Sequence, residues 1–190
     1  MTPLRATLPL VCALLLALGT GPVMAQQLVP AQSEIAFVSK QMGVPVEGRF
    51  KQFGAAVTFD PKKPEAARIG FTVQTGSASF GAAETDAEVP KPAWFNVARF
   101  PTANFQSSAV KALGGGRFEV RGALNIKGAS HEVVVPVSVT QAGAASTAVG
   151  SFVIKRLDFK IGDGEWADTS MVANDVTIRF RLALSGMAPL

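Results

Sequence analysis

The chain has 190 residues, of which 48% are hydrophobic and 17% are charged, with 13 phenylalanines, one histidine and one cysteine. This length suits one domain behind an N-terminal signal, and the apolar content is enough for a sizeable core. The 18 Lys and Arg residues outnumber the 14 Asp and Glu residues but are scattered, which argues against a patch that binds nucleic acid or anionic lipid.

Residues 1–25 have the organisation of a secretory signal peptide. Arg5 gives a positive start, residues 6–19 form an apolar run, and small residues precede Ala25 at the usual cleavage spacing. A membrane anchor is the weaker alternative, because the run is short and is followed by glycines and a proline. We expect cleavage after Ala25. The only cysteine, Cys12, would leave with the signal, so a single domain over residues 26–190 would be held together by its core alone.

Alternation of apolar and polar residues with a period of two predicts antiparallel strands with one buried and one solvent-exposed face. Eight such segments follow one another, at residues 33–39, 46–60, 67–75, 102–113, 117–127, 132–140, 149–161 and 172–184.

The hairpin of residues 117–140 shows the pattern most clearly. Its apolar parity holds Phe118, Val120, Leu124 and Ile126 and then Val133, Val135, Val137 and Val139. The opposite parity of the first strand carries Arg117, Glu119, Arg121, Asn125 and Lys127, which we expect to face water. Gly122 lies on the apolar parity, where a missing side chain indicates a bend or a close approach of another backbone.

Two predicted strands have features beyond the simple alternation. In residues 46–60 the apolar phase slips between Phe50 and Phe53, and a β-bulge near Lys51-Gln52 would restore it. In residues 149–161 we expect an inward row and an opposing polar row. The inward row is Val153, Leu157, Phe159 and Ile161, and the polar row is Arg156, Asp158 and Lys160.

Residues 76–99 have no period of two and form one long connection. We expect a short helix near residues 82–89 and another helical turn near residues 93–97. A connection of this length is usually functional, although a plug over one end of the core explains it equally well. Trp94 and Phe95 belong to it, and Trp166 lies in a second glycine-rich turn at residues 162–166.

An antiparallel set of this size stacks as a sandwich or closes as a barrel, and closure removes the exposed edges. We therefore predict an all-β, eight-stranded antiparallel barrel with a short helical insertion. Eight strands enclose either a packed core or one small ligand, and the pattern alone favours the packed core.

Catalysis has little support in the residues. His131 is the only histidine and lies in the predicted hairpin turn, where a solvated role is usual. Glu84, Asp86 and Glu88 lack the glycine hinge and distal glutamate of a calcium loop, so a solvated face is the better interpretation. We expect no catalytic residues, no metal and no cofactor.

Several segments in order are shared with one family. They are Ser33–Phe37, Gly48-Arg49-Phe50 with Phe53, Val57–Asp60, Trp94-Phe95-Asn96 before Phe100-Pro101, Phe105, Gly122–Gly128, Arg156–Phe159 and Val172–Phe180. In this order and spacing the chain resembles the YceI-like family of periplasmic proteins over residues 29–185. Many members carry early histidines where this chain has Gln32 and Gln41, so the resemblance implies no histidine-dependent role here.

The resemblance implies a lipocalin-like barrel that binds a long isoprenoid lipid, a polyprenol or a quinone, in the periplasm, and it allows a homodimer. The alternative is an accessory module for a cytochrome b561-type membrane protein, and an enzyme acting on a lipid is a third class. The candidate ligand-binding residues are Phe37, Phe50, Phe53, Ile69, Phe71, Val73, Trp94, Phe95, Phe105, Phe118, Val120, Leu124 and Trp166.

Overall fold

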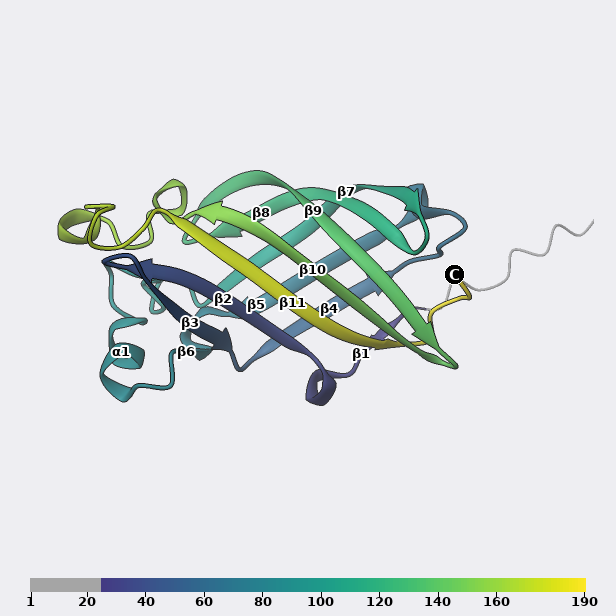
Figure 1. Cartoon of the computed structure of the whole chain (residues 1–190), viewed down its shortest axis with the longest axis horizontal. Helices are drawn as coiled ribbons and strands as arrows, with labels where there is room; N and C mark the ends of the chain where they lie inside the picture. Colours follow the sequence, from purple (N-terminus) through teal and green to yellow (C-terminus); the bar gives the residue numbers. More distant parts are fainter. Residues whose placement is uncertain (1–24) are drawn as a thin grey trace, which may run out of the picture.

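Figure 1 shows the computed structural model of the chain, which describes residues 25–190. The predicted signal peptide lies outside the described residues except for Ala25, and its cleavage stays a prediction. Within the described range, no helix combines the length and the hydropathy that crossing a membrane requires.

The described residues form eleven strands and one short α-helix. The strands are β1 (Gln27–Leu28), β2 (Glu34–Gln41), β3 (Val44–Phe50), β4 (Phe53–Thr58), β5 (Arg68–Gln74), β6 (Ala78–Ser79), β7 (Thr102–Gly114), β8 (Arg117–Ile126), β9 (Ala129–Ala142), β10 (Ala145–Lys155) and β11 (Asp175–Ser185). The helix α1 spans Ala83–Glu88. It confirms the predicted helical insertion, whereas residues 92–99 form hydrogen-bonded turns rather than a second helical turn.

All strands belong to one sheet, and every pairing in it is antiparallel. Its order is β4-β5-β7-β8-β9-β10-β11-β2-β3-β6, and β1 pairs β11 beside this path. The long strands run obliquely along the molecule and curl into a half-barrel (Figure 1). The all-β, antiparallel prediction is thus confirmed at this level.

The predicted count of eight strands is wrong, for two reasons. Residues 46–60 form two strands, because the chain changes partner at Lys51-Gln52: β3 pairs β2 and β6, and β4 pairs β5. A change of partner therefore causes the phase slip that we attributed to a bulge. The strands β1 and β6 have two residues each, which is too short for a period of two to be visible.

The strand predicted at residues 149–161 also ends early. β10 stops at Lys155, and a 3₁₀-helical turn covers Arg156–Phe159. Strand parity no longer applies in this turn, and the phase before it is opposite to our prediction. Val153 is 55% exposed, whereas Ile154 is buried and faces the interior.

The close approach predicted at Gly122 is confirmed. A Cβ placed on it would lie 2.4 Å from the carbonyl oxygen of Gln106 and 2.5 Å from Cζ of Phe105. Both neighbours belong to β7, the strand that pairs β8 at this point. The missing side chain lets the Phe105 ring lie directly over the β8 backbone.

We expect Gly122→Ala to lower the free energy of unfolding by about 1–3 kcal/mol, because a methyl group there overlaps backbone and ring atoms. Gly54→Ala is the matched control in β4, since no atom lies within 4 Å of its added Cβ. That change should be neutral or stabilise by up to about 1 kcal/mol. Urea unfolding of both variants measures the difference, and equal midpoints would contradict the packing seen at Gly122.

The two ends of the curled sheet differ. At one end lie α1, the β2–β3 hairpin tip and the loop between β10 and β11 (Figure 1). We call this end the mouth. At the other end the described termini meet: the backbone N–H of Gln26 donates to Val57, and the Gln141 amide donates to the Met187 carbonyl. The end with the termini is therefore held by hydrogen bonds between distant segments.

Candidate functional site

The curled sheet surrounds a cavity of about 630 Å³. Its wall is built from inward-facing residues of the long strands, as the alternation of strand side chains requires. Alternating aliphatic residues of β9 and β11 contribute to it: Val135, Val137, Val139, Val176, Ile178, Leu182 and Leu184. Apolar residues make up nearly all of the lining, so the cavity suits an apolar guest.

Twelve of the thirteen predicted ligand-binding residues line this cavity. They are Phe37, Phe50, Ile69, Phe71, Val73, Trp94, Phe95, Phe105, Phe118, Val120, Leu124 and Trp166. Phe53 does not; it packs against the core and lines a surface groove with Lys51 and Gln52. It opens β4 directly after the change of partner, at the edge of the sheet. Contact of these residues with a ligand stays a prediction.

Aromatic residues that the prediction left out complete the wall: Phe59, Phe80, Phe152 and Phe180. Phe59 and Phe180 lie in the predicted strand segments 46–60 and 172–184. Phe80 had no such signal, because it lies in the connection that lacks a period of two.

An aromatic cluster joins the sheet to that connection. The ring centroid of Phe37 lies 5.2 Å from that of Phe50 and 5.2 Å from that of Phe80. The Phe50 ring in turn lies 6.1 Å from Phe95, edge to face. Such pairs add to the stabilisation from buried area, so the connection is packed onto the half-barrel.

At the end with the termini, three buried apolar side chains line the bottom of the cavity. The rings of Phe59 and Phe118 meet edge to face at 5.0 Å, and Met187 is 8% exposed beside them. The side-chain oxygen of Gln26 accepts the backbone N–H of Phe59 at 2.6 Å, which fixes the backbone under the ring. This end of the cavity is therefore apolar and packed.

At the mouth, the two tryptophans meet. The ring centroids of Trp94 and Trp166 are 5.6 Å apart, and both rings line the cavity. Trp94 comes from the long connection and Trp166 from the β10–β11 loop. The backbone N–H of Gly162 donates to the carbonyl of Ala93 at 2.8 Å and joins the two segments directly.

Arg156 holds the β10–β11 loop from inside. It is 2% exposed, although the strand pattern predicted that it faces water. Its five N–H groups donate to five backbone carbonyls, of Ala173, Ile161, Gly162, Trp166 and Val172. Burial lowers the pKa of Arg156, yet a guanidinium stays charged at any physiological pH.

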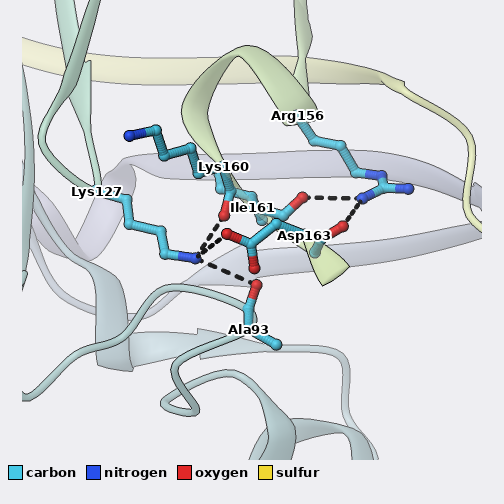
Figure 2. Close-up of polar contacts among 7 residues, drawn as sticks. Ala93, Lys127, Arg156, Lys160, Ile161 and Asp163 are labelled. Atoms are coloured by element: carbon cyan, nitrogen blue, oxygen red, sulfur yellow. Dashed lines mark hydrogen bonds and ion pairs between the residues drawn. The ribbon is translucent and has the colours of Figure 1, made fainter. Parts of the chain in front are cut away.

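Lys127 plays a similar part from the β8–β9 turn (Figure 2). It is 8% exposed, again contrary to the predicted outward position. Its ammonium donates to the carbonyls of Lys160 and Ala93 and lies 3.6 Å from the Asp163 carboxylate. Two buried cations, Lys127 and Arg156, thus fix the loops that carry Trp94 and Trp166.

The remaining polar groups of the cavity gather at the mouth. Ser39 and Gln41 come from β2, and Glu84, Thr85 and Glu88 come from α1. With Arg156 they are the polar and charged side chains of the lining. They place a polar rim at the open end of an otherwise apolar cavity.

Asp86 fixes the position of α1. The backbone N–H of Phe80 and the hydroxyl of Ser79 donate to its carboxylate at 2.6 and 2.7 Å, and these bonds lower the pKa of Asp86. In the β10–β11 loop, the hydroxyl and backbone N–H of Ser170 likewise lower the pKa of Asp168. Both carboxylates serve local structure at the mouth.

His131 has a structural environment. Its ring meets Phe159 edge to face at 4.9 Å, and Nε2 lies 3.0 Å from the Asp158 carbonyl oxygen. Among residues 25–190, no three His, Cys, Asp or Glu side chains come together as a metal site.

The chain is similar to curated proteins named UPF0312. The UPF0312 protein of Pseudomonas aeruginosa strain LESB58 is 31% identical over 162 residues, 77% of this chain and 84% of that protein. The UPF0312 protein of Azotobacter vinelandii is 32% identical over 123 residues, which are 62% of this chain and only 64% of that relative.

Solved structures share the fold. Burkholderia cenocepacia BcnA is 43% identical, with a TM-score of 0.80 over 83% of this chain and 99% of BcnA. A polyisoprenoid binding domain from Saccharophagus degradans is 16% identical, with a TM-score of 0.70 over 87% of this chain and 99% of that domain. The YceI-like domain model matches residues 26–184. This chain therefore belongs to the YceI-like family.

Proposed function

We propose that the half-barrel binds the hydrocarbon chain of a long isoprenoid lipid, a polyprenol or a quinone, and carries it in the periplasm. The observation that carries the proposal is the cavity of about 630 Å³, whose wall is apolar from the packed end to the mouth. The polyisoprenoid binding domain from Saccharophagus degradans has the same fold, which supports the choice of ligand class.

The cavity favours a tunnel over the solid core that the sequence pattern alone suggested. Its volume lies within the range of about 300–1,000 Å³ that is usual for small-molecule sites. Binding there would gain mainly from buried apolar area, at roughly 25 cal/mol per Å² before ordering costs. Selectivity along the wall would then depend on chain shape and length, with the head group near the mouth.

The tryptophan pair provides the test. Delipidated protein titrated with an isoprenoid quinone should show a shift or quenching of tryptophan emission, because Trp94 and Trp166 are the only tryptophans and both line the mouth. The melting temperature should rise with ligand concentration by mass action. At a free ligand concentration of a hundred times Kd, the free energy of unfolding should increase by about 2.7 kcal/mol.

Mass spectrometry of the organic extract from native protein should identify an isoprenoid. A straight-chain fatty alcohol, which is also neutral, serves as the control for unspecific apolar binding. Well-folded delipidated protein that gives neither an emission change nor a thermal shift, with no lipid in the native preparation, would refute lipid binding. It would leave the module for a cytochrome b561-type partner as the standing hypothesis.

A further inference from the structure

We infer that the mouth selects isoprenoids with a neutral, oxygen-bearing head group, an alcohol or a quinone, and rejects isoprenyl phosphates. This inference rests on the proposed function and names the head group that the same cavity accepts. It follows from the charges and hydrogen bonds of the side chains at the rim.

The described part of the cavity wall contains three charged side chains, Glu84, Glu88 and Arg156. Two of them are carboxylates on α1, and Asp86 holds that helix against β6. Glu84 is exposed and unpaired within the described residues, whereas Glu88 pairs with Lys91. A phosphate at the mouth would therefore meet a net negative charge from α1, an effect that is largest at low salt.

Arg156 is the one cation on the wall, and it has no donor left for an anion. All five of its N–H groups donate hydrogen bonds to backbone carbonyls. A guanidinium has five N–H donors, so none remains. To bind a phosphate it would have to abandon carbonyls that fix the β10–β11 loop. Arg156 therefore stabilises the β10–β11 loop and is not available as a cationic partner for the head group.

None of the nearby lysines lines the cavity. The side chains of Lys40 and Lys160 make no ion pair within the described residues, but they lie outside the lining, and Lys91 and Lys127 are occupied. The ammonium of Lys91 lies 2.5 Å from the Glu88 carboxylate. The ammonium of Lys127 donates hydrogen bonds to two backbone carbonyls and forms an ion pair with Asp163.

Neutral hydrogen-bonding groups, in contrast, are free. The side chains of Ser39, Gln41 and Thr85 line the mouth, and each makes no hydrogen bond to any residue in the described range. A hydroxyl and an amide can donate to a carbonyl or accept from an alcohol. The rim can therefore satisfy a neutral oxygen, and the described cavity lining has no cation with a free donor to neutralise a phosphate dianion.

A matched pair of ligands tests this: geranylgeraniol and geranylgeranyl monophosphate, which share one chain. We expect the alcohol to bind wild-type protein about tenfold or more tightly than the phosphate at low salt, measured by tryptophan emission and calorimetry. In the double variant Glu84→Gln/Glu88→Gln, phosphate binding should strengthen several-fold while alcohol binding stays the same.

The control variant Glu65→Gln/Glu119→Gln also removes two negative charges, but from residues that do not line the cavity. It should keep the wild-type preference for the alcohol. Equal or tighter binding of the phosphate by wild-type protein would overturn the inference and leave the proposed function intact. A preference that both double variants reduce alike would also overturn it, because net charge would then be the cause. Binding of neither ligand, nor of a quinone, would refute the proposed function itself.

Discussion

Arg156→Met should lower the free energy of unfolding by about 3–5 kcal/mol, the usual cost of removing one partner from a buried charged network. The methionine fills the space of the side-chain stem but leaves five carbonyls without their donors. Each buried acceptor that water cannot reach costs about 1–3 kcal/mol. Chemical unfolding followed by circular dichroism measures the loss.

Two variants show whether the loss comes from the carbonyl network. Lys155→Met removes the neighbouring cation, which is exposed and paired with Asp175 at 3.5 Å, and should change stability by less than about 1 kcal/mol. Arg156→Lys keeps the charge but has three donors for five carbonyls, so its stability should be intermediate. An Arg156→Met protein as stable as Lys155→Met would show that the carbonyls find water or other donors.

Arg156 and Lys127 also mark where prediction from the sequence failed. Both lie on the polar parity of predicted strands, which is why we expected them to face water. Each, however, lies just past the last residue of its strand: β10 ends at Lys155 and β8 at Ile126. There the backbone turns, with Lys127 at a φ of 49°, and strand parity no longer determines which way a side chain points.

The interiors of the long strands other than β10 could be predicted well, because a sheet with one buried face imposes a period of two on its sequence. The inward rows of β8, β9 and β11 follow that rule, and the cavity wall follows from them. The half-barrel itself could not be predicted this way. Its shape depends on the change of partner at Lys51-Gln52 and on two-residue strands, whose pairing involves residues far away in the chain.

The mouth was predictable in part. Its aromatic residues, the absence of strand pattern in residues 76–99 and the glycine-rich turn near Trp166 all indicated the two segments that form it. The contact between Trp94 and Trp166, 72 positions apart, has no signal in one sequence. Nor do the buried lysine and arginine that hold the two segments together.

Two phenylalanines on the wall should respond differently to truncation. Phe118 is 5% exposed and packs on Phe59, so Phe118→Ala should cost about 3–5 kcal/mol in ligand-free protein. Phe71 lines the cavity but is only half-buried, so Phe71→Ala should cost about 1–3 kcal/mol, because part of its ring already faces empty space. Thermal and urea unfolding of delipidated protein measure both losses.

A bound isoprenoid should change this order. If Phe71 contacts the lipid chain, Phe71→Ala weakens binding and loses part of the ligand-linked stabilisation. A tenfold weaker Kd removes about 1.4 kcal/mol at saturating ligand, so the loss in loaded protein should exceed the loss in ligand-free protein by about that amount. Phe53→Ala is the matched control, because its ring packs on the core without lining the cavity, and its loss should be the same in both forms. Losses at Phe71 that do not depend on the lipid would show that the chain does not lie along this wall.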